Sequence, residues 1–214
     1  MQRPFGVLAL QGDFAAHAAA FDGLGVPVRE VRRVAQLEGL SGLMIPGGES
    51  TTLLNLMADE PWFEALRRFH DQGGVLAGTC AGAILLSRDV RPRQPSLALL
   101  DAVIERNAYG RQVDSFEASV EAPALGGPIA AVFIRAPRFR ALYPEVEVLG
   151  RCQGEPVLVR QGRVVAATFH PELTRSRGLH EYLAALAGGY PVSSPPITTV
   201  QGRTLQRVTT PLRT

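Results

Sequence analysis

The sequence predicts an α/β protein in which helices cover both faces of a mostly parallel sheet. In the N-terminal half, short apolar runs alternate with segments of helical periodicity, and turns containing glycine or proline separate them. Strand, helix and strand at this spacing form βαβ units, whose strands lie parallel in one sheet. The length of 214 residues, 46% of them hydrophobic, suits one domain with a substantial core.

The predicted elements follow in a regular order. The first half contains strands at 5–10, 26–31, 42–45 and 75–78, a helix at 14–24, helical periodicity through 53–57 and 62–69, and a helix ending at 86. From 97 to 165 a more antiparallel section is expected, with strand-like runs at 113–120, 129–135, 146–150 and 156–159. A strand at 163–169 and a closing helix through 179–186 complete a domain that we expect to span residues 1–189. Residues 190–214 are rich in proline, serine and threonine, which predicts a weakly ordered tail.

Composition argues against several classes of function. The formal net charge of +2 gives no reason to expect a nucleic-acid or membrane partner. Two cysteines do not make a disulfide framework in a chain of this size. No secretory leader is recognisable, and no apolar run approaches the length of a membrane span. We therefore expect a cytoplasmic protein, and no cluster of histidine, cysteine and carboxylate has the spacing of a metal site.

The strongest local signal is the segment GTCAG, which places Cys80 between a predicted strand and a predicted helix. Small residues on both sides of a nucleophile allow the sharp turn and the close packing that such an elbow requires. The start of the helix favours the thiolate and offers free N–H groups to an oxyanion. An isolated cysteine is usually an inert core residue, and Cys152 fits that description. The glycine frame around Cys80 favours a nucleophile instead.

A thiolate that cleaves a carboxamide needs a base that can also protonate the departing ammonia. His170 stands at the end of the predicted strand 163–169, and the ends of parallel strands are where sites form in open α/β sheets. His17, His70 and His180 fall in or beside helical segments. In extended chain Glu172 would point to the same side as His170 and orient its imidazole.

A third feature is the glycine turn after the strand 42–45, with the sequence PGGES. Consecutive glycines let backbone N–H groups turn toward a ligand, as an oxyanion hole or a carboxylate-binding loop requires. Alone, such a segment is only a turn. Its position at the end of a second parallel strand predicts that it meets the cysteine elbow.

Together these residues resemble the class I, or triad, glutamine amidotransferases. More narrowly, the chain resembles the glutaminase subunit of pyridoxal 5′-phosphate synthase from about residue 5 to about residue 187. The similarity is carried, in order, by LQGD, IPGGESTT, GTCAG, RNAYGRQ, DSFE, FIRAP and FHPEL. IPGGESTT and RNAYGRQ together are specific to this subunit, whereas related glutaminases share only the elbow and the HPE segment.

The resemblance implies a three-layer, flavodoxin-like sandwich of the class I glutamine amidotransferase type. It implies that Cys80 is the nucleophile, His170 the base and Glu172 the partner of that base. The other expected site residues are Gly48 and Ala81 in the oxyanion hole, Gly48, Glu49, Ser50, Arg106, Ile134 and Arg135 around the glutamine, and Gln11 facing the partner subunit. The sequence alone favours Arg106 and Arg135 as ordinary surface arginines, but an arginine suits the α-carboxylate of glutamine and the resemblance favours that role.

The resemblance also implies a partner, a (β/α)₈-barrel synthase subunit that receives the ammonia in a large heteromeric complex. No cofactor is expected on this chain, because pyridoxal phosphate would be made on the partner. The hypothesis follows that the chain alone is nearly inactive, with the oxyanion loop at residues 46–48 not yet set. Two alternatives stay open: a glutaminase that serves another synthase or cleaves γ-glutamyl groups, and a non-catalytic regulatory subunit of the same fold.

Overall fold

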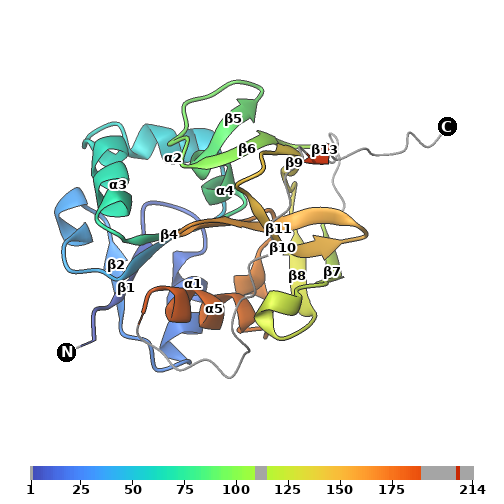
Figure 1. The fold of residues 1–214 in the computed structure, drawn as a ribbon. Helices are drawn as coiled ribbons and strands as arrows, with labels where there is room; N and C mark the ends of the chain where they lie inside the picture. The colour runs from blue at the N-terminus through green and yellow to red at the C-terminus, as the bar shows by residue number, and fades with distance from the viewer. Residues whose placement is uncertain (1, 109–114, 189–205, 208–214) are drawn as a thin grey trace.

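The computed structural model describes residues 2–108, 115–188 and 206–207. Within these residues the largest sheet has seven strands and divides the molecule (Figure 1). In spatial order they are β10 (Glu147–Cys152), β11 (Glu155–Gln161), β12 (Val164–Ala167), β4 (Val75–Thr79), β3 (Gly42–Ile45), β1 (Phe5–Leu8) and β2 (Val28–Val31). The strands from β12 to β2 are parallel, while β10 and β11 are antiparallel. The mostly parallel sheet and the later antiparallel section are thus both confirmed.

Helices cover both faces of this sheet and make a three-layer sandwich (Figure 1). One face carries α1 (Phe14–Asp22) and α5 (Gly178–Leu186), which pack on each other. The other face carries α2 (Ser50–Leu56), α3 (Trp62–Asp71) and α4 (Ala81–Leu86). The predicted α/β sandwich is confirmed.

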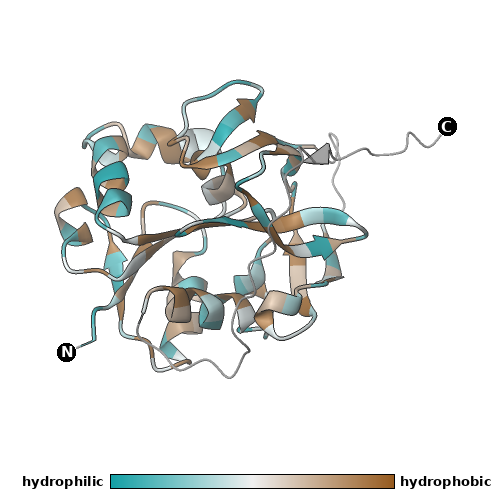
Figure 2. Cartoon of the chain, in the orientation of Figure 1, coloured by the Kyte–Doolittle hydropathy of each residue, from teal (hydrophilic) through white to brown (hydrophobic). Residues whose placement is uncertain are grey.

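Alternation of side chains along the strands creates two apolar layers, because successive residues point to opposite faces of a sheet. In β3, Leu43 and Ile45 pack with α2, α3 and α4, whereas Met44 packs with α1 and α5. On the second face Phe5 stacks on Phe21 of α1, with ring centroids 4.5 Å apart. Figure 2 shows the resulting pattern of apolar central strands and more polar outer segments. Strands buried on both faces explain why continuous apolar runs predicted them correctly.

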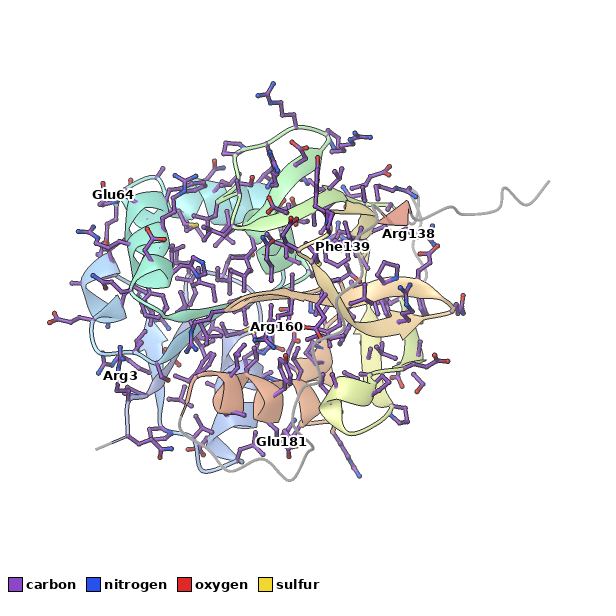
Figure 3. The ribbon with its side chains drawn as sticks, in the orientation of Figure 1. Arg3, Glu64, Arg138, Phe139, Arg160 and Glu181 are labelled. Atoms are coloured by element: carbon purple, nitrogen blue, oxygen red, sulfur yellow. The ribbon has the colours of Figure 1, made fainter. Side chains whose placement is uncertain are left out.

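Charged side chains lie around this core. Figure 3 shows Glu64 on α3 and Glu181 on α5 pointing away from the sheet. Arg160 of β11 lies between the sheet and α5, where it donates to the hydroxyl of Tyr182 at 3.1 Å. This contact ties the antiparallel edge of the sheet to the closing helix.

Smaller elements flank the sandwich. A second sheet has the order β13 (Gln206–Arg207), β9 (Arg138–Leu142), β6 (Leu100–Glu105) and β5 (Ser87–Arg91), and a two-stranded sheet pairs β7 (Phe116–Val120) with β8 (Ile129–Phe133). Short 3-10 helices are η1 (Val34–Leu37), η2 (Pro123–Leu125) and η3 (Pro171–Leu173). The strands β5, β6 and β9 were not among the predicted runs. Charged residues interrupt β5 and β9, so neither shows a continuous apolar or strictly alternating pattern.

Several predicted boundaries shift by a few residues. The first strand ends at Leu8 rather than at residue 10, and the run predicted at 113–120 forms a strand from Phe116 onward, with 113 and 114 outside the described residues. Of the predicted tail, the description covers only Gln206–Arg207, which pair with β9, so the expectation for 190–214 stays a prediction. Among the described residues, no helix combines the length and the apolar character that a membrane crossing needs.

Glycines allow β3, β4 and α4 to approach closely at the cysteine elbow. A Cβ atom added to Gly82 would collide with the backbone carbonyl oxygen of Ile45 at the end of β3, and one added to Gly78 would collide with the backbone of Gly82. The small residues that the sequence places on either side of Cys80 are therefore required by packing of backbone on backbone.

We predict that Gly82→Ala destabilises the fold by about 1–3 kcal/mol, the usual cost of forcing an extra carbon into a filled space. Gly23→Ala is the matched control, because Gly23 ends α1 with φ −62° and an alanine fits that conformation. Urea denaturation followed by circular dichroism measures both. Equal stability of Gly82→Ala and wild type would contradict the argument.

Candidate active site

The candidate site lies where neighbouring parallel strands end at one edge of the sheet. Strand β3 leads into the glycine turn, β4 into Cys80, and β12 toward His170, while β1 ends shortly before Gln11. Because β12, β4, β3 and β1 are adjacent in the sheet, their carboxyl ends bring these segments together. This arrangement agrees with the expectation from the sequence that the glycine turn and the cysteine elbow lie close together.

Cys80 occupies a strained turn between β4 and α4. Its backbone angles are φ 45° and ψ −100°, in a region that residues with side chains seldom adopt. The backbone N–H of Cys80 donates to the carbonyl of Ala167 in β12 at 2.9 Å, which fixes the turn against the neighbouring strand. The residue is 6% exposed and borders the cavity described below. The backbone therefore holds the sulfur at the edge of the sheet.

His170 and Glu172 form a buried pair beside Cys80. Nδ1 of His170 lies 2.7 Å from Oε1 of Glu172, and the backbone N–H of His170 donates to Val132 of β8 at 2.8 Å. The expected contact exists, but the expected extended geometry is wrong. His170 precedes the 3-10 helix η3, and the turn of that helix returns Glu172 to the imidazole.

The charges around His170 favour its protonated form. Burial alone would lower the pKa of His170, but hydrogen bonds and charge interactions with Cys80 and Glu172 outweigh it and raise the pKa to about 10. The imidazole thus interacts with Cys80 as well as with the carboxylate of Glu172. A thiol, an imidazole and a carboxylate thus stand in the order that a catalytic triad requires.

A cavity of about 300 Å³ opens above these residues, at the lower end of the range for small-molecule sites. The sequence-predicted site residues line this cavity with two exceptions. Ala81 and Gln11 do not belong to the described residues of its lining. Sequence reasoning missed other lining residues, of which Gly12 and Asn107 fall inside the LQGD and RNAYGRQ segments. The lining residues are Gly12, Asp13, Gly47, Gly48, Glu49, Ser50, Cys80, Ile84, Arg106, Asn107, Ile134, Arg135, His170, Glu172 and Leu173. Of RNAYGRQ, residues 109–112 lie outside the described residues.

The glycine turn lies directly against the histidine. A Cβ atom on Gly47, the first of the two consecutive glycines noted in the sequence, would collide with the imidazole of His170, so only glycine fits there. The side chain of Gln11 holds the turn from the other side. Its Nε2 donates to the carbonyl of Gly47 at 3.4 Å, and its Oε1 accepts from the N–H of Glu49 at 3.2 Å. Gly48, between them, adopts φ 134°.

Opposite charges line the part of the cavity beside the glycine turn. Arg106 is 3.1 Å from the Oε1 atom of Glu49, and their side chains are 15% and 43% exposed. Partial burial opposes ionisation of Glu49, but hydrogen bonds from Thr51 and the charges of Arg106 and Arg135 hold its pKa below the usual range. Arg135 itself has φ 42° and is exposed. This part of the cavity thus offers the carboxylate of Glu49 and the guanidinium groups of Arg106 and Arg135 to a ligand.

Ser50 and Ile134 complete the placement of the predicted ligand-binding residues. Ser50 begins α2, is 3% exposed, and its hydroxyl donates to Oε1 of Gln94 at 2.9 Å. Ile134 follows β8, which reaches the site because Val132 bridges to His170. Ala81 begins α4 directly after Cys80 and is fully buried.

Two histidines that the sequence analysis left in ordinary helices lie behind Glu172. They are His17 of α1 and His180 of α5, both fully buried. No local pattern distinguishes them from satisfied core residues, because the contact depends on how α1 packs on α5. Among the described residues no group of three histidines, cysteines or carboxylates is arranged to hold a metal ion.

Similar proteins support the assignment of a family. The model of the SNO glutamine amidotransferase family matches residues 7–185. A protein of Thermus thermophilus named pyridoxal 5′-phosphate synthase subunit PdxT is 54% identical over 88% of this chain and 100% of its own length. A Deinococcus radiodurans protein of the same name is 50% identical over 86% of this chain and 96% of its own.

Solved structures agree. A crystal structure described as a glutamine amidotransferase superposes with a TM-score of 0.81 at 51% identity and covers 86% of this chain and 98% of that one. PurLQS from Thermotoga maritima superposes with a TM-score of 0.68 at 15% identity over 86% of this chain and 99% of that one, which shows a shared fold alone. The match to the family model and the identity to these relatives extend over most of the chain, and the chain accordingly belongs to the SNO glutamine amidotransferase family.

Proposed function

We propose that this chain is a glutaminase that hydrolyses L-glutamine to L-glutamate and ammonia through Cys80, His170 and Glu172. The observation that carries the proposal is the hydrogen-bonded order of sulfur, imidazole and carboxylate at the edge of a cavity. Membership of a glutamine amidotransferase family supports the same substrate.

In the first half of the proposed reaction, the sulfur of Cys80 attacks the carbon of the side-chain carboxamide and a C–S bond forms. The negative charge that develops on the carboxamide oxygen would be stabilised by the backbone N–H groups of Gly48 and Ala81. His170 gives its proton to the nitrogen and the C–N bond breaks. Ammonia departs, and a γ-glutamyl thioester remains on Cys80.

In the second half, His170 accepts a proton from water, and the resulting nucleophile attacks the thioester carbon. The C–S bond then breaks, the new γ-carboxyl group releases its remaining proton to solvent as glutamate leaves, and the imidazolium and thiolate are restored. Glu172 stabilises the imidazolium and fixes the ring so that Nε2 faces the sulfur and the substrate. No step needs a cofactor or a metal ion.

We propose that the charged part of the cavity binds the amino-acid end of glutamine. The α-carboxylate suits Arg106 and Arg135, and the α-ammonium suits Glu49, so the zwitterion matches the charges present. Gly48, Ser50 and Ile134 complete the expected contacts.

We further propose that the ammonia passes to a pyridoxal 5′-phosphate synthase subunit for vitamin B6 biosynthesis. Relatives at 50–54% identity carry the name of that synthase, which supports such a partner. The barrel fold of the partner, the large complex, the cytoplasmic location and the role of Gln11 at the interface stay predictions. Gln11 holds Gly47 and Glu49, so a partner that displaced its side chain would alter the oxyanion loop.

The alternatives make different predictions. A glutaminase that serves another synthase would show the same chemistry with a different partner, which co-purification would identify. A non-catalytic subunit would leave Cys80 unmodified by a glutamine-mimicking electrophile. The strained elbow and the buried pair around Cys80 favour the enzyme, because a regulatory subunit has no chemical need for either.

The principal test is ammonia release from glutamine with and without the synthase subunit. We expect slow release by the isolated chain, strong stimulation by the synthase, and a loss of about a thousandfold or more in Cys80→Ser. Cys152→Ser is the matched control and should retain full activity, because Cys152 is buried in β10 away from the cavity. An equal rate with and without synthase would contradict the dependence, and an active Cys80→Ser would contradict the mechanism.

Arg106→Gln tests substrate binding. Loss of a hydrogen bond between charged groups costs about 1.5–3 kcal/mol, so KM for glutamine should rise about 10- to 100-fold while kcat changes less. Arg88→Gln is a suitable control, since Arg88 pairs with Asp101 outside the cavity. Steady-state kinetics in the presence of the synthase measure both variants. An unchanged KM would exclude Arg106 from substrate binding.

The pKa of His170 predicts a pH dependence of stability. The folded protein holds this proton more tightly than the unfolded chain, so the stabilisation is complete below about pH 6.5 and is lost as pH rises through about 10. The difference in free energy of unfolding between wild type and Glu172→Gln should therefore be largest near about pH 6 and shrink toward about pH 10. Urea denaturation at several pH values measures it, and a constant difference would refute the prediction.

A further inference from the structure

Behind Glu172, two histidines that the proposed mechanism does not use continue the line of polar groups into the core. Nε2 of His17 lies 3.2 Å from Oε2 of Glu172, and both side chains are fully buried. Nδ1 of His17 lies 3.0 Å from Nε2 of His180. The order from the cavity inward is therefore Cys80, His170, Glu172, His17 and His180.

The second carboxylate oxygen of Glu172 needs a donor. Oε1 is occupied by His170, while Oε2 is buried and makes no aligned hydrogen bond with the residues that the structure describes. A buried carboxylate oxygen without a donor is costly, because it has lost water and gained nothing in exchange. Nε2 of His17 is 3.2 Å from this oxygen, so it is near enough to donate once either group turns to align the N–H with Oε2.

Burial favours the neutral form of both inner histidines, which fixes how many protons each ring carries. Burial, and then the charges of His180 and His170, hold the pKa of His17 well below its ordinary value. Burial, with a smaller contribution from Arg177, lowers the pKa of His180 to about 3. Each ring therefore carries a single N–H through the physiological pH range.

One assignment of these protons satisfies the contacts. Nε2–H of His180 donates to Nδ1 of His17, which leaves the N–H of His17 on Nε2. That nitrogen is aligned with the hydroxyl of Thr79 at 3.3 Å and also lies 3.2 Å from Oε2 of Glu172, a contact that is not aligned. Nδ1 of His180, which has no partner in the described structure, is then a bare acceptor. The opposite assignment would direct a lone pair of His17 at the carboxylate and bury an unpaired N–H on His180.

The helices hold this arrangement from outside the site. His17 lies on α1 and His180 on α5, which pack on each other beneath the sheet, and α1 also contacts η3. The ring of Phe21 meets His180 edge-on, with centroids 4.9 Å apart. The position of His17 is thus determined by core packing, while its Nε2 reaches the carboxylate of the site.

We propose that His17, held by His180, is a positioning residue that fixes the carboxylate of Glu172 and, through it, the imidazole of His170. A carboxylate held on both sides keeps the ring of the base in one orientation and stabilises its protonated form. This inference rests on the proposed triad, but it makes its own prediction about His170.

The test compares two replacements of His17 that differ in one donor. His17→Leu removes the donor and keeps the site apolar, whereas His17→Gln places an amide N–H near the position of Nε2. NMR titration of histidine-labelled protein, without glutamine or synthase, should show the pKa of His170 lowered by about one unit or more in His17→Leu and largely restored in His17→Gln. His70→Leu is the control, since His70 lies on α3 against the other face of the sheet.

Glutaminase kinetics with the synthase give the second readout. His17→Leu should lower kcat about 10- to 100-fold, as expected when the group that orients a catalytic residue loses its own partner, with KM within about twofold. His17→Gln should recover most of kcat. If His17→Leu does not fold, His17→Asn takes its place, because its shorter amide should not reach Glu172.

An unchanged titration of His170 and an unchanged kcat in the donor-free variant would overturn the inference. Equal losses in His17→Leu and His17→Gln would also overturn it, because they would indicate a packing role alone. Failure of the proposed function has a different signature, namely activity that survives Cys80→Ser. The two failures are therefore distinguishable.

Discussion

The site depends on one constraint, the side-by-side alignment of the parallel strands β12, β4, β3 and β1. Their carboxyl ends lie at one edge of the sheet, so segments distant in the sequence meet there without long loops. The backbone N–H of Cys80 donates to Ala167 across this edge, and Gln11 reaches from the end of β1 to the turn after β3. Register between strands therefore sets the geometry of Cys80 and of the turn beside it.

This alignment leaves little space, which explains the positions of the glycines. Gly82 permits α4 to approach the end of β3, and Gly47 permits the turn to lie against His170. Both positions exclude a side chain because backbone or an essential ring already fills the space. The two glycine segments in the sequence are thus explained by close packing at the site. The same contacts maintain the strained φ of Cys80.

The sequence predicts those features of the structure that leave a pattern in neighbouring residues, and it does not predict those that arise only when distant segments pack together. The strand 42–45 is buried on both faces, so a continuous apolar run predicts it with its observed bounds. Strand β5 carries exposed charged residues and β9 carries two half-buried arginines, so neither has such a signal. The sequence predicts the pairing of His170 with Glu172, but in extended chain. The structure pairs them through a 3-10 turn that begins at Pro171. His17 could not be recognised at all, because its contact with Glu172 arises only when α1 packs beneath the sheet.

Two pairs of opposite charges in the site differ in burial, and the difference fits the roles proposed for them. Glu49 and Arg106 are partly exposed, so water screens their attraction and a zwitterionic ligand can replace it at small cost. His170 and Glu172 are buried, and breaking such a pair leaves an uncompensated charge in a medium of low polarity. In the proposed mechanism the exposed pair can therefore exchange partners with the ligand, whereas Glu172 must stay against His170 while the imidazole loses and regains its proton. Neutral histidines behind Glu172 suit that requirement, because a charged neighbour there would compete with His170 for the carboxylate.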